Sequence, residues 1–210
     1  MTTQTIMKAR IADEISRADL TTQIGYAITD AIEYYQAIRF YFNETNAAGL
    51  TFSTVASQEV YDVDDNATLP WVYDVDDVFV VVGGNNYRLK RIEPTLYRLN
   101  QASASGQPYE YMWNKQQFSF NPVPDAIYSM IVTGHYKVAA PATDGEASNP
   151  WMVDAERMIR SAAKRILYQD IILDGEAAQA CALAEDEAFW RLKGTTNKFT
   201  ATGYVKAMQF

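Results

Sequence analysis

The spacing of apolar residues changes twice along the 210 residues, and this layout constrains the fold more than any other feature. Between residues 6 and 42, apolar side chains such as Ile24 and Ile28 recur every three or four positions, which is typical of a buried helical face. Residues 47–140 instead form short Tyr-rich segments separated by turn residues, which favour strands. Helical spacing returns over residues 149–194. The layout predicts an α+β fold, a four-helix core of two N-terminal and two C-terminal helices that carries a long antiparallel β insertion.

Capping and helix-breaking residues indicate where the helices begin and end. Asn149-Pro150 supplies an N-cap and a first helical residue. Asp174-Gly175 and Gly194 are stop signals at the end of a helical pattern. We therefore expect four long helices at about Thr5–Ala18, Thr22–Phe40, Pro150–Leu173 and Glu176–Lys193.

Short apolar segments between turn signals predict the strands. Turns such as Gly83–Asn86, with two Gly and two Asn, are typical of hairpins and so favour antiparallel pairing. A short helix is expected over Thr95–Leu99, after Pro94. The expected strands are Leu50–Val55, Glu59–Val63, Trp71–Asp74, Val78–Val82, Tyr87–Ile92, Tyr109–Trp113, Gln117–Asn121 and Ile127–Val138.

The expected helices and strands divide the chain into a helical core, a β domain and an arm. The helical core comprises residues 1–44 plus 149–194, the β domain residues 45–140, and a linker residues 141–148. Residues 195–210 form a polar C-terminal arm, whose three separated aromatic residues are too few to build a core of their own. The arm is therefore either a disordered tag or a segment that orders on a partner through Phe199, Tyr204 and Phe210.

Composition narrows the class of protein. A hydrophobic content of 48% allows a sizeable core. The net charge of −8 argues against ordinary nucleic-acid binding, which needs clustered Lys and Arg. The single cysteine, Cys181, fits a reducing compartment. We expect synthesis in a cytoplasm and no membrane segment, because the N-terminus lacks a secretory apolar stretch and no apolar run approaches the roughly 20 residues of a membrane helix.

One stretch of the β region is acidic and carries no Lys or Arg. An EF-hand calcium loop counted from its first aspartate needs Gly at position six and Glu at position twelve, but Ala67 and Tyr73 stand there. The stretch therefore indicates a solvated negative rim rather than a metal site, and carboxylates that faced a channel would keep DNA from sticking to its wall. Its members are Asp62, Asp64, Asp65, Asp74, Asp76 and Asp77.

No catalytic or cofactor-binding constellation is evident. His135 has no second histidine with which to build a metal site, and the helical spacing puts Cys181 on a face with alanines. Gly83-Gly84 is followed by a strand rather than by the helix N-terminus that holds phosphate. Two alternatives stay open: a glycan hydrolase that uses paired carboxylates, and a carbohydrate-binding β module with aromatic platforms such as Trp71, Trp113 and Tyr111.

Several short segments, in their order, resemble the head-to-tail adaptor (connector or tail accessory) proteins of tailed phages. The resemblance spans roughly Arg10–Trp190. The segments are Arg10–Glu14, Asp19-Leu20, Gln23-Ile24, Ala27-Ile28, Ala31-Ile32, Tyr35, Arg39–Glu44, Thr54–Gln58, Tyr61, Pro94-Thr95, Tyr97, Gly106–Tyr111, Phe118–Pro124, Tyr128 and Asn149–Trp151.

The resemblance implies a structural virion protein without a cofactor or catalytic residues. It implies a homo-oligomeric ring, commonly a dodecamer, that binds the portal above and the next tail or nozzle protein below, at the neck of the virion. Double-stranded DNA would pass through the ring without sequence-specific binding. C-terminal extensions in the family often reach toward the portal, and residues 195–210 are the matching segment here. Ring contacts are heterologous, so each copy needs two different complementary sides.

Overall fold

The computed structural model describes residues 2–45, 49–66, 69–99, 102 and 104–200. Its contacts divide the chain into two compact units. The helical unit comprises Met1–Phe42 with Val138–Phe210, and the β unit comprises Asn43–Lys137. Helices thus flank a strand region with two largely antiparallel sheets, and the predicted α+β class is confirmed.

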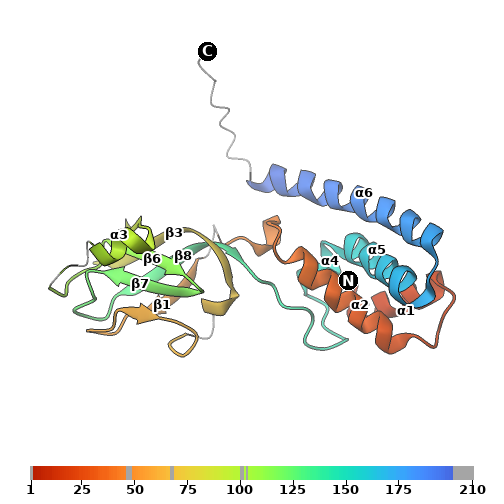
Figure 1. The fold of residues 1–210 in the computed structure, drawn as a ribbon, viewed down its shortest axis with the longest axis horizontal. Coiled ribbons are helices and arrows are strands. Elements are labelled where there is room, and N and C mark those ends of the chain that lie inside the picture. The colour runs from red at the N-terminus through yellow and green to blue at the C-terminus, as the bar shows by residue number, and fades with distance from the viewer. Residues whose placement is uncertain (1, 46–48, 67–68, 100–101, 103, 201–210) are drawn as a thin grey trace, which may run out of the picture. The chain divides into compact units, whose positions relative to one another are not determined.

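Among the described residues, the helical unit has four helices of 11 to 26 residues and one short helix, α4, and α6 runs alongside α5 (Figure 1). Thr3 caps α1, and Asn149 caps α4 by accepting from the Trp151 N–H at 3.1 Å. A short 3₁₀ turn, Tyr41–Asn43, comes after α2 in the sequence. The bounds are α1 Gln4–Glu14, α2 Thr21–Tyr35, α4 Pro150–Val153, α5 Glu156–Leu167 and α6 Gly175–Thr200.

All four expected helices differ in extent from the observed ones. The first helix ends at Glu14 rather than near Ala18. The second helix ends at Tyr35 rather than near Phe40. The expected helix Pro150–Leu173 is interrupted between α4 and α5, and its last turn is a π-helix, Tyr168–Ile172. The last helix does not end at Gly194 but continues to Thr200. Leu192 and Thr196, on either side of that glycine, are both buried, so packing outweighs the roughly 1 kcal/mol that Gly costs within a helix.

A single apolar core joins the helices of this unit. Trp151 is fully buried, and its indole N–H donates to the Val138 carbonyl at 2.8 Å. Its ring packs edge-on against Phe40, which in turn meets Phe189 of α6 edge-on. Apolar burial of this kind contributes roughly 25 cal/mol per Å². Because all five helices contribute to the core, it fixes their packing within the unit.

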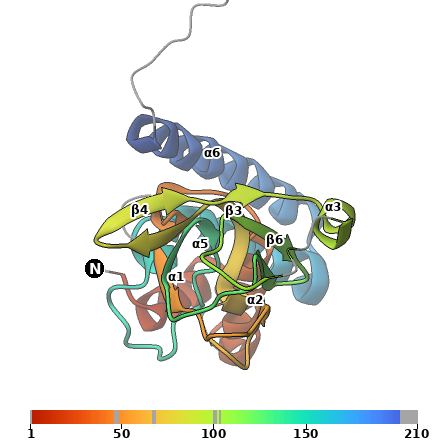
Figure 2. The ribbon, with the colours of Figure 1, turned by 90° about the vertical axis from the view of Figure 1, so that its left-hand side faces the viewer.

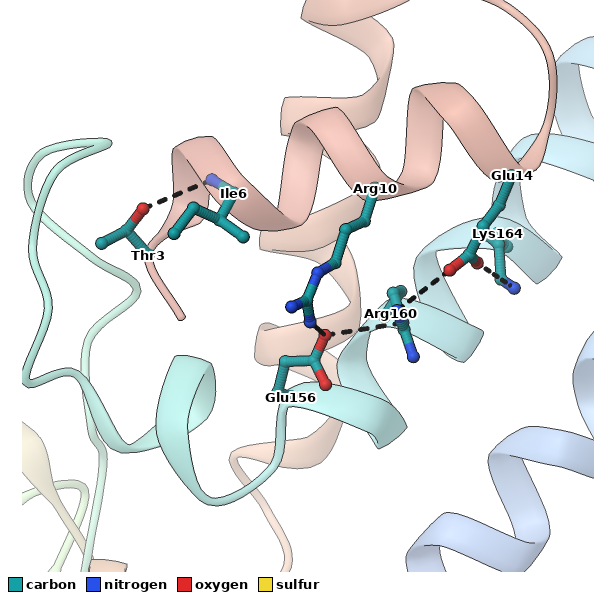
Figure 3. Close-up of polar contacts among 7 residues, drawn as sticks. All are labelled: Thr3, Ile6, Arg10, Glu14, Glu156, Arg160 and Lys164. Atoms are coloured by element: carbon teal, nitrogen blue, oxygen red, sulfur yellow. Dashed lines mark hydrogen bonds and ion pairs between the residues drawn. The ribbon is translucent and has the colours of Figure 1, made fainter. Parts of the chain in front are cut away.

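Ion pairs join α1 to α5 along one edge of this core (Figure 3). Arg10 bonds Glu156 at 3.1 Å, and Glu14 accepts from both Arg160 at 2.9 Å and Lys164 at 2.5 Å. These side chains are partly exposed, so each pair contributes at most about 1 kcal/mol. The pairs therefore contribute little to the stability of the unit, and their main effect is to align α1 along α5.

The β unit holds two sheets, each four-stranded among the described residues, in the orders β1-β8-β3-β4 and β2-β7-β6-β5. A short helix, α3 (Pro94–Leu99), confirms the helix expected after Pro94; it is seen with the β3–β4 hairpin in Figure 2. Phe52 and Met130 from the first sheet share one core with Phe118 and Phe120 from the second. The strands are β1 Leu50–Ser53, β2 Val60–Tyr61, β3 Val72–Val82, β4 Asn85–Arg88, β5 Lys90–Arg91, β6 Glu110–Asn114, β7 Gln117–Asn121 and β8 Ser129–Tyr136.

Two strand expectations were wrong. Trp71–Asp74 and Val78–Val82 belong to one strand, β3, because two register shifts against β8 keep the intervening acidic residues in the sheet. At one of these bulges the backbone passes so close to Gly134 that a Cβ there would lie 2.2 Å from the Asp74 carbonyl oxygen. The expected strand Tyr87–Ile92 divides into β4 and β5, which join different sheets, and β5 pairs with β6 in parallel.

Candidate contact surfaces

Of the three arm aromatics, only Phe199 lies within the described residues; Tyr204 and Phe210 lie outside them. Phe199 belongs to the last turn of α6 rather than to an extended arm. Its ring lies against Tyr41, with centroids 4.9 Å apart, yet 69% of the residue is exposed. Aromatic rings that are packed on one side and exposed on the other are enriched at protein contact surfaces.

Next to this aromatic pair, α6 and the α4–α5 junction border a groove of about 220 Å³, which we call the α6 groove. Its floor is apolar and consists of Ala155, Met158, Ala188 and Leu192. Its rim carries the polar groups Tyr41, Asp154, Arg157 and Arg191. Burial, and then the hydrogen bond to the Asp154 carboxylate, raise the pKa of Tyr41 to about 12, so this hydroxyl is a neutral donor at physiological pH.

A buried polar network fixes α6, and with it the groove, within the unit. Glu185 of α6 accepts from the Tyr35 hydroxyl of α2 at 2.6 Å and from the Arg165 Nε of α5 at 2.6 Å. Only 6% of the Glu185 side chain is exposed. Burial, followed by the bond to Glu185, raises the pKa of Tyr35 well above its usual value. A buried carboxylate with both partners in place tolerates little displacement of any of the three helices.

The structure also shows exposed apolar residues that the periodicity argument did not single out. Leu183 and Trp190 lie on the outer side of α6, and Tyr26 and Tyr34 on the outer side of α2, each at least two-thirds exposed. Helical spacing alone could have found them, because Tyr26 and Tyr34 fall out of phase with the buried residues Ile24, Ile28 and Tyr35. Exposed aromatic rings on one helical face are a common mark of protein contact sites.

The six acidic residues do not form one cluster, because they belong to two elements in different sheets. Asp62, Asp64 and Asp65 follow β2, and Gln117 of β7 donates a hydrogen bond to the Asp62 carboxylate at 3.1 Å. Gln58 likewise donates to Asp65 at 2.6 Å. Asp74, Asp76 and Asp77 lie within β3, where Asp77 pairs with Arg88 of β4 at 2.5 Å. Within the described ranges, no set of three or more Asp, Glu, His or Cys is placed to hold a metal ion.

Three residues considered for chemical or ligand-binding roles, His135, Cys181 and Tyr111, are buried or half-buried. His135 is buried, lies 3.0 Å from the Asn43 amide nitrogen, and contacts the Tyr73 ring. Cys181 is half-buried, and burial raises the pKa of its thiol, which disfavours the reactive thiolate. Of the aromatic platforms considered for sugar binding, Tyr111 is only 1% exposed and therefore belongs to the core. None of the helices described is long and apolar enough to cross a membrane.

Comparison with known families gives one match that covers both units. The model of a family described as SU10 adaptor protein matches residues 1–204, which include every described helix and strand. The comparison with curated proteins found no match.

Proposed function

The chain belongs to the SU10 adaptor protein family, and from this premise we propose that it forms a homo-oligomeric ring that joins the portal to the tail of a phage particle. Membership of a phage adaptor family makes the chain a structural component of a virion. We further propose that the protein is made in the host cytoplasm and sits at the neck of the particle. The family match over nearly the whole chain is the single observation that carries the proposal.

Exposed residues on several helices of the helical unit support this proposal. A ring subunit must offer two different faces to its neighbours and further faces to the portal and to the tail or nozzle protein. Exposed aromatic residues stand on separate helices, as Tyr26 and Tyr34 do on α2 and Trp190 and Phe199 do on α6. We assign Phe199, with Tyr204 and Phe210, to the portal contact. The ring is a dodecamer in this proposal.

We propose that the acidic residues of the β unit form a surface that repels DNA. Asp64, Asp74 and Asp76 are exposed, and the overall charge is −8. A negative wall along a DNA channel keeps the phosphates from binding, whereas a cationic wall would hold them. We therefore assign all six aspartates of the acidic stretch to the lumen or to a tail-facing rim. The protein acts in this proposal through shape and buried surface, with no enzymatic step.

The experiment is to mix the purified chain with the cognate portal and to image the product by cryo-electron microscopy. We expect a complete ring of this chain on one end of the portal. Portal particles that stay bare at saturating amounts of the chain would contradict the proposal.

The portal contact has its own variant and matched control. Phe199→Ala removes an exposed ring from the end of α6, and Tyr109→Ala removes one of similar exposure from the β unit. We expect the first to weaken portal binding about tenfold or more and the second to leave binding unchanged. If both variants bind the portal equally well, Phe199 is not part of the portal contact, and the proposed ring is unaffected.

A further inference from the structure

Several charged side chains of the helical unit form ion pairs within the unit, whereas the two acidic residues on the outer face of α2 do not. Arg10, Arg160, Lys164 and Arg165 all have carboxylate partners. Asp30 and Glu33 are exposed and form no ion pair with any described residue. Tyr26, Asp30, Glu33 and Tyr34 lie at spacings of one, three and four residues, so they share one side of the helix. We call these four residues the α2 face.

Two cations without ion-pair partners lie at the α6 groove and beyond it. Arg191, on the rim of the groove, and Lys198 are exposed and pair with no described residue. They are seven positions apart, which places them on one side of α6 about 10 Å apart along its axis. Residues 191–200 contain three basic residues, Arg191, Lys193 and Lys198, and no acidic one. This end of α6 is therefore positive in a chain that is acidic overall.

We propose that the α2 face of one copy packs onto the α6 groove of a second copy, with Asp30 and Glu33 opposite Arg191 and Lys198. The two surfaces are complementary in charge, and each also has apolar area that the contact can bury. The α2 face offers two exposed tyrosine rings, and the groove offers an apolar floor on which such rings can pack. This inference rests on the proposed ring and names the surfaces through which its subunits meet.

The α2 face of one copy cannot reach the α6 groove of the same copy. α2 and α6 pack into the same core and are joined through the Tyr35–Glu185–Arg165 network, so the α2 face is held pointing away from that core. Two different surfaces on one rigid unit give a head-to-tail contact, which closes into a ring when the rotation between copies allows it. The tyrosines supply most of the buried apolar area, and the charges select the partner face and its register.

Charge reversal with compensation tests the pairing directly. One double variant, Arg191→Glu with Lys198→Glu, makes the groove side acidic, and another, Asp30→Lys with Glu33→Lys, makes the α2 face basic. We expect each alone to reduce the number of copies on the cognate portal at least tenfold, because like charges then meet. An equal mixture of the two, and the quadruple variant, should both restore the wild-type number, because every contact is then again between opposite charges.

A matched control carries the same charge change at other sites of the unit. Asp13→Lys with Asp170→Lys alters two exposed acidic residues on α1 and in the π turn, and we expect normal assembly. All variants are compared by thermal unfolding, which should coincide with wild type because the altered side chains are exposed. A second readout is a disulfide between Glu33→Cys in one copy and Arg191→Cys in another, each in a Cys181→Ser background.

The outcomes separate this inference from the proposed function. If the wild type forms a ring and either double variant assembles as well as the control, the α2–α6 contact is wrong and the adaptor role stands. Failure of the mixture and the quadruple variant to recover, or the absence of the disulfide in the wild-type-like ring, also overturns the contact. If the wild type itself never forms a ring on the portal, both the proposed function and this inference are refuted.

Discussion

Removal of the Arg165 guanidinium tests whether the buried carboxylate fixes α6. Arg165→Met keeps most of the side-chain volume but leaves Glu185, 6% exposed, with only the Tyr35 hydroxyl as its partner. Breaking a buried pair costs about 3–5 kcal/mol. Arg165 is itself 24% exposed, so water replaces part of the lost interaction and we expect the lower end, about 3 kcal/mol. The assay is urea unfolding followed by circular dichroism at a helical wavelength.

Two comparisons make this prediction specific. Arg157→Met breaks the exposed pair with Glu187, whose side chains are 48% and 64% exposed, and should cost less than about 1 kcal/mol. Arg165→Met combined with Glu185→Leu removes both charges and should recover at least half of the loss, because no buried charge is then left unpaired. Equal losses for Arg165→Met and Arg157→Met, or no recovery in the double variant, would show that the network does not hold α6.

The remaining predictions concern two glycines and two tyrosines whose pKa values are raised. Gly134→Ala places a Cβ 2.2 Å from the Asp74 carbonyl oxygen and should cost roughly 3 kcal/mol or more in urea unfolding, whereas Gly145→Ala, with open space around it, should change stability by less than about 1 kcal/mol. The raised pKa values of Tyr35 and Tyr41 keep these hydroxyls protonated in the folded chain while the unfolded chain loses its protons from about pH 10. The stability they contribute is complete below pH 10 and declines as pH rises toward the folded values, by at most about 1.4 kcal/mol per pH unit for each tyrosine. Tyr35→Phe should flatten that alkaline decline, and an unchanged pH profile of unfolding in this variant would contradict the assignment.

The sequence was a good guide where local periodicity and turn chemistry decide the structure. The stripe Ile24, Ile28 and Ala31 is buried as expected, and Asn149 caps a helix that begins at Pro150. The strand expected at Gln117–Asn121 was confirmed to the residue. These features depend on neighbours within a few positions, which a single sequence displays directly.

Features that depend on distant residues were not foreseen. Gly194 is a common stop signal, but burial of Leu192 and Thr196 carries α6 past it. The acidic residues between Val72 and Val78 stay in one strand because bulges against β8 accommodate them. The α6 groove could not be read from the sequence, since it combines Tyr41, the α4–α5 junction and α6. Its rim residues show no pattern until the core brings these segments together.

A cryo-electron microscopy reconstruction of the neck of the intact phage particle would show whether this chain is the neck adaptor. We expect a ring of density between portal and tail into which the helical unit and the β unit fit repeatedly, with the channel through its centre. The adaptor role would be refuted if other proteins explained all densities of the neck and this chain lay elsewhere in the particle or were missing from it.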